Sequence, residues 1–282
     1  MPELPEVENI AAGLRKEIIG QGIRELVIRN PAIVKGSYQR SWRKAAGQLA
    51  GGRITKVSRR AKRLIIYTDK ELAILVQLGM TGKFLLYEPE EESQKHVRFS
   101  IKFYGDKYLW YLDVRRFGRV WFMEGLTEEN MDEVMEQAGL GKLGPESDSI
   151  QTKEFQEILS CKRPVKSLLL DQAKIGGLGN IYADESLFMA RIYPGTRANK
   201  LNSMQANVLR KSIRAVIRKA IAHGGTTFSD FRNVYGGKGG FRKLLKVYQR
   251  TGEPCRKCKT AIERIQIGGR STHFCPKCQV KK

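Results

Sequence analysis

The first three residues of the chain include Pro2 and Glu3, two residues with the properties of catalytic groups. Removal of Met1 would leave Pro2 with a free α-amino group, whose pKa of about 8 lies well below the value of about 10.4 for lysine. At neutral pH the nucleophilic, neutral amine is therefore roughly a few hundred times more populated than in a lysine side chain. Such an amine forms a Schiff base with the aldehyde of a ring-opened sugar. Glu3, its neighbour, can donate a proton to the ring oxygen.

The same residues also suit a purely structural role. Proline and glutamate are favoured at the start of a helix, and the glutamates then form the polar side of that helix. We expect Glu6 to anchor the helix start through backbone N–H groups and Glu8 to be an exposed helix residue. The N-terminal residues alone leave the catalytic and the structural interpretations open.

Four cysteines near the C-terminus have the spacing of a zinc site. Cys255 and Cys258 form one C-x2-C pair, Cys275 and Cys278 form another, and sixteen residues separate the two pairs. Four thiolates complete a tetrahedron and leave no open position, which predicts one structural Zn2+ rather than a catalytic one. Two disulfides are the weaker alternative in a reducing compartment. Cys161 is expected to be an ordinary thiol.

The residues around these cysteines are strongly basic. The last 28 residues hold eight Lys or Arg and one Glu, and Arg270 lies in the turn between the two cysteine pairs. The whole chain of 282 residues carries a formal net charge of +22, so the default partner is a polyanion such as nucleic acid. The alternative is a generically basic protein with a zinc-stapled subdomain whose charges are simply solvated.

The bulk composition indicates a globular protein with room for two domains. The apolar fraction is 41% and the charged fraction is 28%, which are values of a folded protein rather than a disordered one. No stretch approaches 18 consecutive apolar residues, and no secretory signal is visible at the N-terminus. We therefore expect a cytoplasmic protein with no membrane partner.

An N-terminal β-sandwich domain with a leading helix is predicted for residues 1–137. Apolar residues recur at helical spacing over 5–19, and the pattern ends at Gly20. Short β-rich runs follow from about residue 22, and the Gly105–Asp106 pair between two alternating runs predicts a hairpin. Several antiparallel strands with one leading helix form the β part of an α+β fold.

The second half of the chain is predicted to be helical. A linker rich in Gly and Ser at 138–150 precedes a helical domain at 151–246, and the cysteines define a zinc finger at 247–282. Within the helical domain, residues 225–245 place many glycines and polar residues around three phenylalanines. This composition predicts a long mobile loop.

Six segments spread in order over the whole chain closely resemble the bacterial formamidopyrimidine-DNA glycosylase family. They are MPELPEVE, RRAK at 59–62, QLGMTG at 77–82, DVRRFGR at 113–119, GGLGNIYADE at 176–185 and the four-cysteine finger. The resemblance implies a β-sandwich domain, a helix–two-turn–helix domain and a zinc finger, in a monomer that binds damaged double-stranded DNA without a small-molecule cofactor. It also implies a bifunctional enzyme that excises oxidised purines, such as 8-oxoguanine and formamidopyrimidines, and then cleaves the strand by β,δ-elimination.

The resemblance assigns four catalytic positions. Pro2 matches the Schiff-base nucleophile that attacks C1′, and Glu3 matches the general acid. Lys62 matches a lysine that grips phosphate beside the damaged nucleotide and assists β-elimination. Arg270 matches the zinc-finger arginine that clamps phosphate and donates a proton during δ-elimination. Without the surrounding match, Lys62 would be interpreted as a solvated lysine beside a strand.

Other matched positions hold the DNA once the damaged nucleotide is flipped out. Met80, Arg115 and Phe117 match a triad that fills the gap, in which an apolar or aromatic wedge restores stacking and an arginine pairs with the orphaned cytosine. Taken one at a time, Met80 and Phe117 are more typical of a core. Further DNA contacts implied by the match are His96, Arg116, Lys162, Lys166 and Asn180.

The chain departs from common family forms at Gln77, Thr81 and Val114. Gln77 stands where a His is frequent and keeps a hydrogen-bonding amide, so the grip on phosphate is the property that it can alter. Residues 225–245 match the variable lid over the flipped base. Lesion preference is therefore expected to depend on this loop.

Two other functions remain open from the sequence. An endonuclease VIII-like glycosylase for oxidised pyrimidines is a sister enzyme, although it usually carries Gly where Leu4 stands here. A non-enzymatic zinc-ribbon DNA-binding protein would use the same basic surface and form no covalent intermediate. A repair enzyme of the resembled kind is expected in the cytoplasm, associated with the nucleoid.

Overall fold

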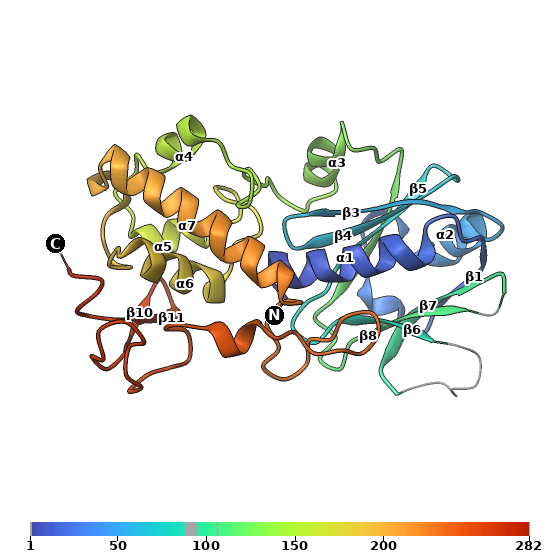
Figure 1. Cartoon of the computed structure of the whole chain (residues 1–282). Helices are drawn as coiled ribbons and strands as arrows, with labels where there is room; N and C mark the ends of the chain where they lie inside the picture. The colour runs from blue at the N-terminus through green and yellow to red at the C-terminus, as the bar shows by residue number, and fades with distance from the viewer. Residues whose placement is uncertain (1, 88–94, 106, 282) are drawn as a thin grey trace. The chain divides into compact units, whose positions relative to one another are not determined.

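The computed structural model describes residues 2–87, 95–105 and 107–281, which form two compact units (Figure 1). The sandwich unit comprises Met1–Lys142 together with Gly224–Gly240, and the helical unit comprises Leu143–His223 together with Phe241–Lys282. Segment Gly224–Gly240 therefore packs with the sandwich unit, although its neighbours in the sequence belong to the helical unit. Met1 and Asp106 lie outside the described residues.

Two β-sheets form the sandwich unit. The first has the strand order β1-β7-β8-β6, with β1 at Ile23–Ile28, β7 at Val97–Phe103, β8 at Tyr108–Leu112 and β6 at Lys83–Tyr87. The second has the order β2-β9-β5-β4-β3, with β2 at Val34–Lys35, β9 at Arg119–Glu124, β5 at Leu72–Gln77, β4 at Arg63–Thr68 and β3 at Ile54–Arg60. The predicted β-sandwich is confirmed, and so is the antiparallel pairing of β7 with β8 on either side of the predicted hairpin turn.

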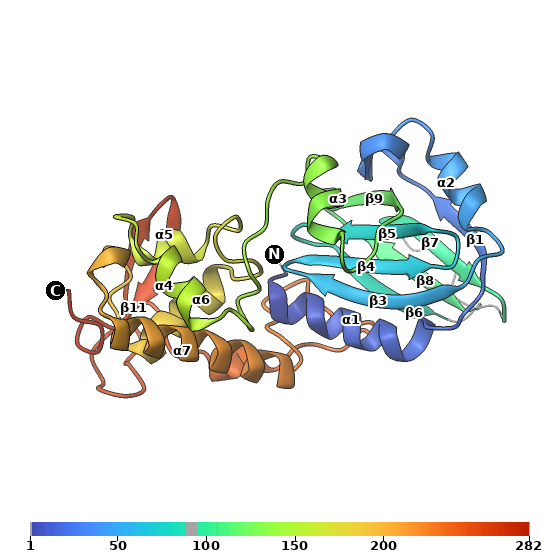
Figure 2. The same cartoon turned by 90° about the horizontal axis from the view of Figure 1, so that it is seen from above.

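One apolar core lies between the sheets, and α1 contributes to it. The helix spans Leu4–Ile18, close to the predicted 5–19, and packs along β3 and β4 with its apolar stripe buried (Figure 2). Phe84, Phe99 and Tyr111 meet in this core with ring centroids 5.2 to 5.8 Å apart. The remaining helices of the unit are η1 at Pro31–Ile33, η2 at Gly36–Tyr38, α2 at Trp42–Leu49 and α3 at Met131–Gln137.

Residues 225–245 do not form one continuous mobile loop. Phe231 and Val234 are buried in the core of the sandwich unit, and the Val234 carbonyl accepts a hydrogen bond of 3.0 Å from the Leu86 N–H. Phe241–Leu244 instead forms the 3-10 helix η4 of the helical unit. Two apolar side chains thus anchor a segment whose composition is otherwise that of a loop.

Four α-helices and a β-hairpin form the helical unit. They are α4 at Thr152–Ile158, α5 at Val165–Leu169, α6 at Asn180–Ala190, α7 at Ser203–Ala222, β10 at Glu263–Ile267 and β11 at Arg270–Phe274, with the short η3 at Ala198–Lys200. The helix α6 packs against both α7 and β11, so it joins the helices to the hairpin. Among the described residues, no helix has the length and apolar character that crossing a membrane requires.

Candidate DNA interface and catalytic residues

The first turn of α1 carries the predicted nucleophile and acid. Pro2 precedes Glu3, which is the N-cap of α1 and only 4% exposed. The Oε2 atom of Glu6 accepts a hydrogen bond of 2.8 Å from the Glu3 N–H, as expected of an anchor at the helix start. A carboxylate at this position satisfies one of the N–H groups that a helix N-terminus leaves unpaired. The roles of Pro2 and Glu3 in catalysis remain predictions.

The other oxygen of Glu6 binds the segment predicted to be the lid. Its Oε1 accepts a hydrogen bond of 2.8 Å from the Thr226 N–H, and the Glu6 side chain is 1% exposed. The adjacent Gly225 has φ of +79°, and a Cβ there would lie 3.0 Å from Oε1 of Glu6. One buried carboxylate therefore holds the start of α1 and the start of the predicted lid together.

Lys62 lies in the two-residue turn between β3 and β4. The preceding Ala61 has φ of 52°, a conformation that few residues other than glycine adopt. Arg59 donates a hydrogen bond of 3.2 Å to the Ala61 carbonyl, and it also donates to Glu8 at 2.9 Å. The Glu8 side chain is 21% exposed and pairs with Arg15 at 2.7 Å, so the expectation of an exposed, solvated helix residue is wrong.

In the predicted triad, Arg115 contacts both Met80 and Phe117. The Arg115 guanidinium lies 4.8 Å from the Phe117 ring centroid and donates to the Met80 sulfur at 3.3 Å. Met80 is 42% and Phe117 49% exposed, which removes the interpretation of either as a core residue. Exposed apolar and aromatic side chains beside an arginine form the group of residues that a duplex gap would accept.

Asp113, which was not among the predicted site residues, joins the two loops that carry this triad. The first loop, 78–82, connects β5 to β6, and the second, 113–118, connects β8 to β9. It is fully buried, and its carboxylate accepts hydrogen bonds from the Thr81 hydroxyl and, at 2.7 Å, from the Gly118 N–H. The Thr81 hydroxyl in turn accepts from the Arg115 N–H at 3.0 Å. Asp113 is the one acid of the DVRRFGR segment, beside three arginines, and this contrast was the signal that the sequence offered.

Gly79 lets the same two loops approach closely. Its φ is +71°, and a Cβ there would lie 2.6 Å from the Gly118 nitrogen. Arg116 is exposed at the tip of the second loop with φ of 58°. His96 adjoins the loop base, where its carbonyl accepts from the Asp113 N–H at 3.1 Å. Gln77 ends β5, and it is half-buried beside Arg63 and Arg119 on the flanking strands.

In the helical unit, the side chain of Asn180 binds the backbone next to Arg270. Asn180 begins α6, and its Nδ2 donates at 3.0 Å to the carbonyl of Ser271, the residue after Arg270. Arg270 is exposed and directly follows a turn in which Gly268 and Gly269 both have positive φ. The two glycines allow the tight turn that β10 and β11 require, so Arg270, expected between the two cysteine pairs, begins β11 at the end of the hairpin.

Lys166 does not reach the surface, and its expected contact with DNA is wrong for this structure. The residue is 0% exposed, and its Nζ lies 2.6 Å from Asp184, 2.8 Å from the Ser271 carbonyl and 2.9 Å from the Thr272 hydroxyl. These three partners match the three N–H bonds of an ammonium group. By contrast, Lys162 is exposed just before α5 and stays a predicted DNA contact.

Two further acids of the GGLGNIYADE segment join α6 to the zinc-finger module. Asp184 accepts from the backbone and ring nitrogens of His273 at 2.9 and 3.1 Å. Glu185 accepts from the N–H groups of three successive residues, Lys246, Val247 and Tyr248, at 2.9 to 3.0 Å. Burial raises the pKa of Glu185, while these backbone donors act in the opposite direction.

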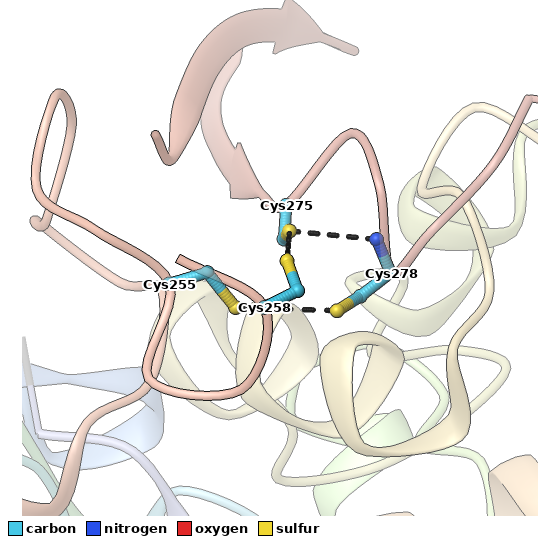
Figure 3. Close-up of side chains that lie close together, drawn as sticks. All are labelled: Cys255, Cys258, Cys275 and Cys278. Atoms are coloured by element: carbon cyan, nitrogen blue, oxygen red, sulfur yellow. Dashed lines mark hydrogen bonds between the residues drawn. The ribbon is translucent and has the colours of Figure 1, made fainter. Parts of the chain in front are cut away.

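The four predicted cysteine ligands converge at one point (Figure 3). Their sulfur atoms all lie within 4.8 Å of one another, with Cys258 and Cys275 3.4 Å apart and Cys255 and Cys278 4.0 Å apart. A zinc–sulfur bond of about 2.3 Å places the corners of a tetrahedron about 3.8 Å apart, so the donor set fits zinc. Cys161 is half-buried and stands outside this cluster.

Comparisons with known proteins cover nearly all of the chain. Residues 1–120 match the formamidopyrimidine-DNA glycosylase N-terminal domain, residues 143–232 match the H2TH domain of that family, and residues 252–280 match a zinc finger found in FPG and IleRS. A formamidopyrimidine-DNA glycosylase of Latilactobacillus sakei is 39% identical over 285 residues, which cover 100% of this chain and 99% of that protein. The Acaryochloris marina protein of the same name is 40% identical over 287 residues, covering 99% of each. The chain belongs to the formamidopyrimidine-DNA glycosylase family.

Solved structures of formamidopyrimidine-DNA glycosylases share the fold. The Lactococcus lactis protein in complex with DNA containing an abasic site matches with a TM-score of 0.88 at 35% identity, over 99% of this chain and 100% of that one. A mutant of the same protein with Fapy-dG DNA matches equally well. In this chain the four cysteines form a structural zinc site, and Cys275 directly follows the end of β11.

Proposed function

We propose that this DNA glycosylase of base excision repair removes oxidised purines from double-stranded DNA and then cleaves the strand, acting as a monomer with Pro2 as its nucleophile. The observation that carries the proposal is the exposed cluster of Met80, Arg115 and Phe117. Its apolar side chains face solvent and contribute nothing to the buried core, so they are available to bind DNA. Such a cluster fits an enzyme that takes a nucleotide out of the stack. Its site of action is the DNA of the cytoplasm, in the nucleoid.

The first chemical steps use the N-terminus. The neutral amine of Pro2 attacks C1′, the glycosidic bond breaks, and the electron pair leaves with the damaged base. Glu3 donates a proton to the ring oxygen as the sugar opens, which leaves an iminium between Pro2 and C1′. The buried hydrogen bond from the Glu3 N–H to Glu6 holds this turn in place during the attack.

Strand cleavage follows from the same iminium. Loss of a proton from C2′ lets the 3′-phosphate leave by β-elimination, and Lys62 assists this step while it holds the neighbouring phosphate. A second elimination releases the 5′-phosphate, with Arg270 as the phosphate clamp and proton donor. Hydrolysis of the remaining imine then frees Pro2. Each basic residue that neutralises a phosphate adds a slope of about −0.9 to the dependence of log affinity on log salt.

Borohydride trapping tests the nucleophile. A duplex with one abasic site is incubated with processed wild-type protein or with Pro2→Gly, and the covalent adduct is counted after reduction. We expect a trapped adduct through Pro2 in the wild type and a large loss in the variant. A wild-type protein that gives no adduct, with Met1 shown to be removed, would leave only a DNA-binding role.

A comparison of two lesions tests the substrate class. Excision of 8-oxoguanine opposite cytosine is measured beside excision of thymine glycol in otherwise identical duplexes. We expect faster release of 8-oxoguanine. A strong preference for thymine glycol would instead assign the chain the substrate range of an endonuclease VIII-like enzyme.

A further inference from the structure

The turn that carries Lys62 is surrounded by arginines that are committed to internal contacts. Arg60 makes two hydrogen bonds of 2.8 Å with the Asp132 carboxylate on α3, and Arg63 donates to the Leu140 carbonyl at 2.5 Å. Arg59 is turned to the other side, toward α1, where it meets Glu8. The basic residues of the run Arg59–Arg63 are therefore a lysine in the turn and three arginines that tie the turn to its surroundings.

The contact between Glu8 and Arg59 is partly buried. The Arg59 side chain is 8% exposed and the Glu8 side chain 21% exposed, with Nε 2.9 Å from Oε2. Burial alone would raise the pKa of Glu8, but hydrogen bonds from Arg15 and Arg59 outweigh it and leave this pKa lowered. Glu8 is therefore ionised at neutral pH, and the stabilisation it gives is lost only as the pH falls through its lowered folded-state pKa.

Arg59 uses the same guanidinium to hold the backbone of the turn. Its NH1 donates to the carbonyl of Ala61, the residue with φ of 52°. Positive φ at an alanine is unfavourable and persists only where neighbouring contacts fix it. With the guanidinium held by Glu8, the Ala61 carbonyl has a donor in a fixed place, and the direction in which Lys62 leaves the turn is set.

Glu8 links this turn to the element that carries the nucleophile. It lies on α1, the helix whose N-cap is Glu3 and whose first turn follows Pro2. Arg15, two turns further along the same face of α1, reinforces the link through its own hydrogen bond of 2.9 Å to the Val57 carbonyl of β3. The separation between the N-terminal amine and Lys62 thus depends on this polar contact between α1 and β3.

We propose that Glu8 and Arg59 are positioning residues that fix Lys62 relative to the Pro2 amine, so that nucleophile and lysine act on the same sugar. The inference rests on the proposed role of Lys62 in strand cleavage. Reacting groups must be placed to within a fraction of an ångström, and a misplacement of about 1 Å costs up to about a hundredfold in rate.

The experiment measures single-turnover strand cleavage of a duplex with a preformed abasic site, at saturating enzyme. Glu8→Gln keeps the size of the side chain but removes the charge, and Arg59→Lys keeps the charge but removes the fork that reaches both partners. We expect both variants to slow cleavage by about tenfold to a hundredfold, with affinity for a tetrahydrofuran-containing duplex within about twofold of wild type. Glu128→Gln is the matched control. Glu128 pairs with Lys56, which lies on β3 as Arg59 does, but this ion pair is exposed.

A double-variant cycle separates positioning from a general structural effect. If Glu8 acts through Lys62, then adding Glu8→Gln to Lys62→Ala leaves the already reduced rate unchanged. An equal further loss in the double variant, a wild-type rate in Glu8→Gln or Arg59→Lys, or the same loss in Glu128→Gln would each overturn the inference. A wild-type cleavage rate in Lys62→Ala would instead remove the proposed role of Lys62, and the positioning inference with it.

Discussion

The Oε1 atom of Glu6 accepts a hydrogen bond of 2.8 Å from the backbone N–H of Thr226, 220 residues along the chain. Its Oε2 accepts from the Glu3 N–H at the same distance. The carboxylate thus connects the predicted catalytic turn with the predicted lid inside the sandwich unit. Both N–H groups are buried and depend on an acceptor at this point.

Substitution of Glu6 is therefore expected to lower the free energy of unfolding in a graded way. Glu6→Ala leaves two buried N–H groups unsatisfied, at about 1–3 kcal/mol each. Glu6→Gln keeps one amide oxygen as acceptor and should lose roughly half as much. Denaturant unfolding measures the free energy of unfolding of the two variants, and Glu25→Gln at an exposed position of β1 is the control. Equal stability of the Gln and Ala variants would show that the hydrogen bond kept by Glu6→Gln contributes nothing.

Substitution of two lysines of the helical unit should distinguish a buried structural charge from a DNA contact. Lys166→Met leaves the Asp184 carboxylate buried without its cation, which we expect to destabilise the protein by about 3–5 kcal/mol. In Lys166→Met, the slope of log DNA affinity against log salt concentration should equal that of the wild type. Lys162→Met at an exposed position should change stability by less than about 0.5 kcal/mol and reduce that slope by about 0.9.

The measurement is DNA affinity at several salt concentrations together with thermal unfolding of each variant. The assignment of Lys166 to the interior fails if its variant unfolds like the wild type and the slope falls. A slope that Lys162→Met leaves unchanged would remove Lys162 from the proposed phosphate contacts.

Zinc binding should depend on pH through the four thiolates. Hydrogen bonds from Thr260 lower the pKa of Cys258 to about 6, whereas burial raises the pKa of Cys275 and raises that of Cys278 to about 12. Because zinc binds the deprotonated sulfur, protons compete with the metal, and zinc release to a chelator should speed up as the pH falls.

Loss of the metal should also weaken DNA binding, because the β10–β11 hairpin that presents Arg270 then loses its fixed base. The check is zinc content and duplex affinity for Cys278→Ser, with Cys161→Ser as the control that leaves both unchanged. Full zinc content in Cys278→Ser would contradict a site of four sulfur ligands.

Local patterns predicted those parts of the structure that depend on short stretches of sequence. The helix α1 follows from apolar residues at helical spacing, and the zinc cluster follows from two C-x2-C pairs, because both signals lie within a few residues. Resemblance, rather than pattern, identified Met80 and Phe117 as exposed. Their residue types alone are typical of a core, and only the folded loops show the two side chains exposed beside Arg115.

Contacts between distant residues account for what the sequence could not predict. A lysine such as Lys166 has no local feature that distinguishes a solvated side chain from one buried against Asp184, 18 positions further along the chain. Glu8 was likewise interpreted from its place on a helix, whereas its environment is set by Arg59 on β3. The anchoring of Phe231 and Val234 depends on a core formed by the other half of the chain.

The contact between Gly13 and Val234 offers a test of the predicted lid. A Cβ on Gly13 would lie 2.5 Å from Cγ2 of Val234, which is fully buried and, as a β-branched residue, has few rotamers to escape into. Gly13→Ala gains up to about 1 kcal/mol of helix propensity, but the anchor of the lid must shift. Gly47→Ala in α2 gains the same propensity with no atom within 4 Å and is the matched control.

We expect Gly13→Ala to slow excision of 8-oxoguanine by about tenfold or more, since displacements near 1 Å have effects up to about a hundredfold. Cleavage at a preformed abasic site should stay within about twofold of wild type, because that substrate has no base for the lid to hold. The ratio of the two single-turnover rates is the measurement, and Gly47→Ala should leave it unchanged. An equal loss of rate on both substrates would show that Gly13→Ala disturbs α1 and the predicted catalytic turn, and not the predicted lid.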